Sequence, residues 1–180
     1  MRIISGTYRG KKIHPPKNLK ARPTTDFAKE SLFNILIHRL DFEGLDILDL
    51  FAGTGSITYE FVSRGVRSVV AVEMAAPLFK FIQQTCRDLE LDRVNLVCGN
   101  AFLYLKNPSQ SFDIIFADPP YDHPQLEEIP DLVFSTKILN QKGLLILEHP
   151  SGYSFTAHTR FLDQRKYGSV NFTLFSTDSV

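Results

Sequence analysis

Apolar residues along the chain gather in short runs, most of which end in a glycine or a polar residue. Five runs, at residues 45–51, 68–72, 94–98, 112–117 and 143–147, have the length and composition of buried strands. The intervals between them favour helices up to residue 65, over 76–89, from 101 and over 126–134. Strands that alternate with helices in this way predict an α/β fold with a doubly wound, mostly parallel sheet.

The two ends of the chain show other patterns. Residues 2–13 contain short apolar runs broken by glycine, which is typical of a small β-hairpin. A helix is predicted over residues 24–39, because apolar positions recur there at helical spacing and acidic residues lie near its start. Near the other end, residues 159–166 and 169–175 flank Tyr167-Gly168 and predict a closing antiparallel hairpin.

Composition limits the class of protein. The 180 residues are 43% apolar and 12% aromatic, which excludes a disordered tail and a disulfide miniprotein. We expect one domain over residues 1–180, with a basic extension at 1–23 and a Rossmann-like core at 24–180. Because no apolar stretch reaches 18 residues and the first residues are polar, we expect a cytoplasmic protein without a membrane span. Cys86 and Cys98 lack metal-ligand spacing, so we expect buried thiols and no metal.

The formal net charge of zero conceals a division along the chain. Residues 1–25 carry seven Lys and Arg and no acid, so they hold a charge of +7 and the remainder holds −7. Such asymmetry predicts either an arm that binds nucleic-acid phosphates or a solvated basic extension. We assign the arm to phosphates, with Arg9, Lys11, Lys12 and Arg22 as the candidate contacts.

Candidate chemistry lies where the predicted strands end, because ligands bind there in open α/β sheets. Gly53 and Gly55 would let the backbone approach a ligand closely, although tight strand-to-helix turns also use glycine for steric reasons. Thr58 replaces the third glycine of the dinucleotide fingerprint, which weakens a nicotinamide hypothesis. Glu73 closes the second core strand, where an acid either accepts both hydroxyls of a ribose or is simply exposed.

Two further strand ends carry polar groups. Asn100 either bonds an adenine amine or caps the following helix, and both roles are compatible. The sequence Asp118-Pro119-Pro120-Tyr121 is the most specific feature, because two prolines remove donors and leave a carboxylate and a carbonyl beside an aromatic ring. That arrangement suits a planar amine with two N–H bonds, and the alternative is a proline-stiffened surface turn.

These residues resemble the S-adenosylmethionine-dependent class I methyltransferases of Rossmann-like fold, in particular the amino-methylating group with an Asp/Asn-Pro-Pro-aromatic motif. Residues 2–10, 22–26 and 30–36 extend the similarity to the bacterial 16S ribosomal RNA guanine-N2 methyltransferases of the RsmD type, over nearly the whole chain. The resemblance implies methylation of a guanine N2 amine without a metal. It also implies small-subunit ribosomal RNA, or the assembling small subunit, as partner, and we expect a monomer.

The resemblance also implies roles for individual residues. The cofactor would contact Thr25, Asp49, Phe51, Gly53, Gly55, Glu73, Asn100 and Ala101, and the catalytic residues would be Asp118, Pro119 and Tyr121, with Tyr121 also stacking on the substrate. Two positions depart from the family pattern, since Asn100 replaces the usual Asp and Phe27 stands where Arg is usual. Methylation of adenine N6 or of a protein glutamine amide stays open. So does a noncatalytic RNA-binding protein of this fold.

Overall fold

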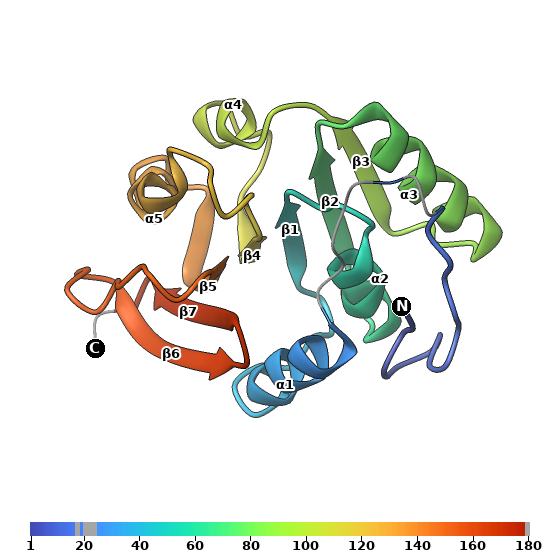
Figure 1. Ribbon diagram of the computed structural model, residues 1–180, viewed down its shortest axis with the longest axis horizontal. Helices are drawn as coiled ribbons and strands as arrows, with labels where there is room; N and C mark the ends of the chain where they lie inside the picture. Colours follow the sequence, from blue (N-terminus) through green and yellow to red (C-terminus); the bar gives the residue numbers. More distant parts are fainter. Residues whose placement is uncertain (17–18, 20–24, 179–180) are drawn as a thin grey trace.

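A computed structural model of the chain describes residues 1–16, 19 and 25–178. Within these residues, seven strands form one sheet in the order β3-β2-β1-β4-β5-β7-β6 (Figure 1). The strands are β1 (Asp46–Leu50), β2 (Ser68–Glu73), β3 (Val94–Cys98), β4 (Phe112–Ala117), β5 (Leu139–His149), β6 (Phe161–Tyr167) and β7 (Val170–Ser176). The first five are parallel, and β7 pairs antiparallel with both β5 and β6. The predicted fold class and the closing hairpin are confirmed.

Helices cover both faces of the sheet. They are α1 (Asp26–Ile37), α2 (Ser56–Ser63), α3 (Ala76–Asp88), α4 (Ala101–Lys106), the 3-10 turn η1 (Leu126–Glu128) and α5 (Ile129–Ser135). The first three helices contribute to one hydrophobic core, and α4, η1 and α5 contribute to the other. Along β1, Ile47 faces the first core while Leu48 and Leu50 face the second. A strand buried on both faces therefore appears in the sequence as a nearly continuous apolar run.

Some predicted details are wrong. Helix α1 ends at Ile37, two residues before the predicted end, and β5 begins at Leu139 rather than at residue 143. The polar residues 140–142 hid this start, because they lie in the register shift between the Phe112–Leu139 and Ile114–Leu144 pairs and are not fully buried. The thiol of Cys98 is exposed and that of Cys86 is half-buried, so the expectation of buried thiols fails for Cys98.

Residues 1–13 of the basic arm form a hairpin-like segment that runs beside α2 (Figure 1). Its described pairing is a single antiparallel bridge between Arg2 and Lys12, with backbone hydrogen bonds around it rather than long strands. The buried carboxylate of Glu60 on α2 anchors the arm by accepting from the backbone N–H groups of Ile4 at 2.8 Å and Ser5 at 3.1 Å. The arm therefore has a defined place on the core.

Two features are absent from the described part of the chain. None of its helices is both long and apolar enough to cross a bilayer. In the same residues, no three His, Cys, Asp or Glu side chains gather as metal ligands would.

Candidate active site

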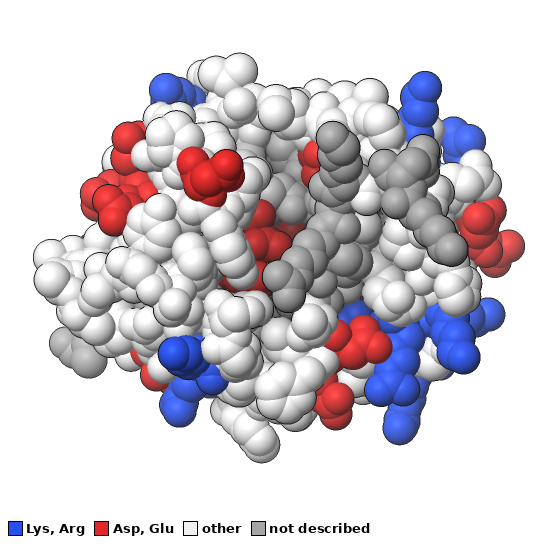
Figure 2. Space-filling model, in the orientation of Figure 1, with Lys and Arg blue, Asp and Glu red and all other residues white. Residues whose placement is uncertain are grey.

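A cavity of about 760 Å³ opens at the carboxyl ends of the parallel strands, where the strand order reverses between β1 and β4. This switch point is where open α/β sheets bind ligands. Figure 2 shows acidic side chains inside the central hollow of this face, whereas the visible Lys and Arg side chains lie toward its edges. The cavity therefore has a negative interior, which favours a ligand that carries positive charge.

The turn after β1 places backbone at one wall of the cavity. Phe51, Gly53 and Gly55 adopt φ values of 61°, 57° and 77°, in the left-handed region. For Phe51 this conformation is strained, and such strain is concentrated at functional sites. A Cβ on Gly53 would meet nothing nearer than the Phe51 carbonyl oxygen at 3.8 Å, so the space beside Gly53 is open. A Cβ on Gly55 would lie 2.5 Å from the Tyr59 ring, so packing explains that glycine.

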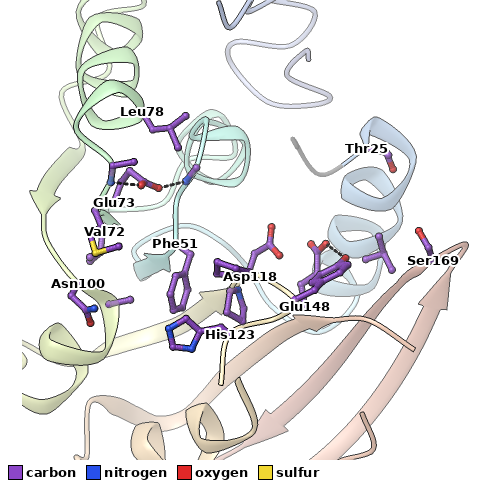
Figure 3. A pocket seen from close by; sticks show the side chains of 18 of the residues that line it. Thr25, Phe51, Val72, Glu73, Leu78, Asn100, Asp118, His123, Glu148 and Ser169 are labelled. Carbon is purple, nitrogen blue, oxygen red and sulfur yellow. Dashed lines mark hydrogen bonds between the residues drawn. The ribbon is translucent and has the colours of Figure 1, made fainter. Parts of the chain in front are cut away.

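The carboxylate of Glu73, at the end of β2, is fixed by two backbone donors. The N–H of Gly53 donates to Oε2 at 2.8 Å and the N–H of Ala75 donates to Oε1 at 2.7 Å (Figure 3). Each oxygen keeps a further lone pair, and the residue is 8% exposed at the cavity wall. Glu73 can therefore accept two hydroxyl groups without rearranging.

Asn100 caps α4, as one of its two predicted roles requires. Its Oδ1 accepts from the backbone N–H groups of Phe102 at 2.8 Å and Leu103 at 3.1 Å. Because these bonds use both lone pairs of Oδ1, any polar contact of Asn100 with a ligand falls to its Nδ2 donor. An adenine amine would therefore need another acceptor.

An aromatic wall lies next to Asn100. The rings of His123 and Phe102 stack with centroids 4.6 Å apart, and Phe51 meets Phe102 edge-on at 5.7 Å. Of these rings, Phe51 and His123 line the cavity. No role was predicted for His123 from the sequence, because a loop rather than a helix or strand brings it here and no residue spacing indicates that position. The rings of Phe51 and His123, tilted 58° to each other, each offer a face on which a heterocycle can stack.

Acidic side chains meet at the centre of the site. Burial raises the pKa of Asp118 well above its usual range, and the nearby carboxylates of Glu148 and Asp49 raise it further. Burial also raises the pKa of Asp49 to about 7, although Thr58 donates a hydrogen bond of 2.5 Å to its Oδ2. Asp118, which follows β4, is thus repelled by carboxyl groups from β1 and β5, and a cation bound beside it would relieve that repulsion.

The Tyr121 side chain lines the same cavity as Asp118 and Glu148. Its hydroxyl donates to Oε1 of Glu148 at 3.1 Å (Figure 3). Glu148 is buried at the end of β5, whereas Tyr121 is 40% exposed. The hydrogen bond fixes one end of the ring, so an accessible aromatic face stands near the Asp118 carboxyl. No catalytic role was predicted for Glu148 from the sequence, and the structure adds this contact.

The opposite side of the cavity comes from elements distant in sequence. Thr25 and Ser169 lie across Asp118 and Glu148 from Glu73 and Asn100 (Figure 3). This side is lined by the start of α1 and by the turn between β6 and β7, namely Thr25, Phe27, Tyr167, Gly168, Ser169 and Val170. Apart from Thr25, sequence analysis assigned none of these residues to the site.

The structure brings most of the predicted site residues together. The cavity is lined by Thr25, Phe51, Gly53, Glu73, Asn100, Ala101, Asp118, Pro119 and Tyr121. Asp49 and Gly55 are predicted cofactor contacts that do not line it; Asp49 is buried behind the turn, and Gly55 packs on Tyr59. Arg9, Lys11 and Lys12 are exposed on the arm, outside the cavity, and Arg22 lies outside the described residues.

Comparisons with known proteins agree with this geometry. The model of the family described as "Conserved hypothetical protein 95" matches residues 1–176. "Ribosomal RNA small subunit methyltransferase D" of Escherichia coli K12 is 31% identical over 148 residues, which cover 82% of this chain and 74% of that protein. The protein of the same name from Buchnera aphidicola (strain Bp) is 30% identical, covering 82% and 75%. The solved structure "Putative methyltransferase yhhF" of Escherichia coli superposes with a TM-score of 0.86 at 28% identity, covering 100% of this chain and 99% of that one.

Proposed function

Since the chain belongs to the family described as Conserved hypothetical protein 95, we propose that it transfers a methyl group from S-adenosylmethionine to the N2 amine of a guanine in small-subunit ribosomal RNA. The names of its relatives support the ribosomal RNA substrate. The observation that carries the amine chemistry is the position of Asp118 and Pro119 at the switch point, between the Glu73 wall and the accessible Tyr121 ring.

The residues of the cavity fit this cofactor. S-adenosylmethionine, when bound, supplies a methyl group activated by a positively charged sulfur. The two oxygens of Glu73 would accept the ribose hydroxyls, and the wall that contains Phe51 and His123 would hold the adenine ring. Asp118 and Glu148 would face the positive charge, which offsets the repulsion between these two carboxyl groups.

The protein then positions and activates the amine. An exocyclic guanine amine is a poor nucleophile, because its lone pair is delocalised into the ring. Acceptance of its two N–H bonds by the Asp118 carboxylate and the Pro119 carbonyl would favour a pyramidal nitrogen with an available lone pair. The nitrogen would gain the methyl group as the bond from that carbon to sulfur breaks, which leaves a neutral thioether, and would lose one proton, to Asp118 or to water. Its raised pKa makes the Asp118 carboxylate a better proton acceptor than an ordinary aspartate.

The substrate must enter the cavity as an unpaired base. A guanine stacked in a duplex cannot reach the carboxyl ends of the strands, so the target is single-stranded or flipped out. Tyr121 offers it an aromatic face beside Asp118. Arg9, Lys11 and Lys12 would hold the RNA phosphates from the arm, which positions the substrate without building the cofactor pocket.

The test is a nucleoside analysis of ribosomal RNA. Small-subunit RNA from cells that lack this protein, incubated with the purified protein and S-adenosylmethionine, should gain N2-methylguanosine by mass spectrometry. Gain of N6-methyladenosine instead would show that the target base is adenine and not guanine. Methyl transfer to a protein glutamine would show that the substrate is a protein and not RNA. Absence of cofactor binding by calorimetry would favour the noncatalytic RNA-binding alternative.

Asp118→Ala should abolish most transfer and leave cofactor affinity within a few-fold. Loss of a hydrogen-bond acceptor used in the reacting geometry costs on the order of 10² to 10³ in rate. Asp122→Ala is the matched control, because Asp122 is an exposed acid nearby that does not line the cavity. Turnover near the wild-type value in folded Asp118→Ala protein would remove Asp118 from the mechanism.

A further inference from the structure

The side of the cavity formed by α1 and the β6–β7 turn carries two aromatic rings. Phe27, in the first turn of α1, and Tyr167, at the end of β6, meet edge to face with centroids 6.1 Å apart and an interplanar angle of 80°. Both line the cavity, and Phe27 is 67% exposed. An accessible aromatic ring at the edge of a binding cavity is a stacking surface for a flat ligand.

Core packing does not account for Phe27. Helix α1 buries Ala28, Leu32, Phe33 and Leu36 in the core, whereas the Phe27 ring stays mostly in solvent. Other large apolar side chains are also exposed, but Leu103, at 64%, lies outside the cavity. Phe27 differs from Leu103 by its aromatic contact and its place on the cavity wall.

We infer that Phe27 and Tyr167 form a second base subsite, which stacks the unpaired base next to the methylated nucleotide. This inference rests on the proposed function. The methylated base would occupy a different part of the cavity, because its amine must reach Asp118, and the Tyr121 ring lies beside that residue. Thr25 and Ser169, which flank the two rings in the sequence, lie farther along the cavity past Glu148 (Figure 3). A strand that delivers one base to Asp118 would carry the adjoining base toward these rings.

The chemistry favours a base over other flat groups. Stacking on aromatic rings tolerates any base, because every base has a π face, and it needs no further polar partner. The arm adds exposed cations at Arg9, Lys11 and Lys12 for the phosphates of the same strand. The subsite thus contributes affinity for single-stranded RNA without reading its sequence.

The test uses a single-stranded RNA oligonucleotide with 2-aminopurine next to a guanine, because stacking quenches 2-aminopurine fluorescence. Wild-type protein should quench the fluorescence. Phe27→Ala should lose the quenching, weaken RNA binding about ten-fold and raise the Michaelis constant for RNA. Phe27→Tyr should keep all three properties near their wild-type values and Phe27→Leu should not. Leu103→Ala is the matched control, and calorimetry should give unchanged S-adenosylmethionine affinity in every variant.

The outcomes separate the subsite from the proposed function. If Phe27→Leu binds and quenches like the wild type, or if Phe27→Ala changes neither RNA affinity nor fluorescence, the subsite is refuted even where N2-methylguanosine is formed. If the wild type methylates no RNA and yet its quenching depends on an aromatic ring at position 27, the methyl transfer fails and the base contact stands. Loss of quenching in Leu103→Ala as well would also refute the assignment.

Discussion

Asp49→Asn should make the stability of the protein less dependent on pH. Asp49 is 1% exposed, and burial raises its pKa to about 7 from an ordinary value of 3.8. The folded state therefore binds more protons than the unfolded state between about pH 4 and pH 7. The stability that depends on the neutral carboxyl is fully present below about pH 4 and is lost as pH rises through 7. Asn stays neutral throughout and can still accept the hydrogen bond from Thr58.

The size of the effect follows from the shift in pKa. Each unit corresponds to about 1.4 kcal/mol, so the stability of Asp49→Asn relative to wild type should rise by on the order of 4 kcal/mol between pH 4 and pH 8. Urea unfolding of both proteins at half-unit pH steps measures this difference, and the titrations of other groups largely cancel. Asp92→Asn, at an exposed position, should show no such trend. Parallel curves for Asp49→Asn and wild type would refute the argument, and a relative stability that falls with pH would show that Thr58 stabilises the charged form.

Other predictions test the turn and the arm. Gly55→Ala should lower the free energy of unfolding measured in urea. The strained φ of 77° costs about 1–3 kcal/mol, and a Cβ 2.5 Å from the Tyr59 ring adds a steric clash to that cost. Gly53→Ala, with its nearest atom at 3.8 Å, should cost only about 1 kcal/mol in stability and should mainly weaken cofactor binding in calorimetry. Replacing Lys11 and Lys12 with Ala should reduce the salt dependence of RNA affinity, making the log–log slope shallower by about 1.4 at roughly 0.7 per phosphate contact. Equal slopes in a salt series would mean that the arm is a solvated extension.

The sheet could be predicted from sequence because its central strands are buried on both faces. The central strand β4 begins and ends where its apolar run does, at residues 112–117. The start of β5 could not be predicted, since Asn140, Gln141 and Lys142 lie in a register shift between two paired positions and keep polar, incompletely buried side chains. Local hydrophobicity reports burial, and it fails where a strand contains an irregular segment outside the core.

The side of the cavity formed by the ends of the parallel strands was predictable for a related reason. In a parallel sheet each strand end lies at the same edge, so polar residues that follow successive strands, such as Glu73 and Asp118, must gather there. No comparable rule applies to the side of the cavity formed by α1 and the β6–β7 turn. Phe27 and Tyr167 come from opposite ends of the chain and meet only because β7 folds antiparallel along β5 and brings β6 with it. The spacing of residues along the sequence does not predict that contact.

Residue type alone also could not separate binding from support within the motifs. Gly53 and Gly55 look equivalent in sequence, yet only Gly53 has open space beside it, and Gly55 is required by the Tyr59 ring. Both Oδ1 lone pairs of Asn100 accept hydrogen bonds in the helix cap. Glu73 also accepts two backbone hydrogen bonds, but its carboxylate keeps further lone pairs for a ligand. The distinction depends on how much hydrogen-bonding capacity and free volume each residue retains after folding. Substitutions at Gly53 and Glu73 should therefore act on cofactor affinity, while those at Gly55 should act first on stability.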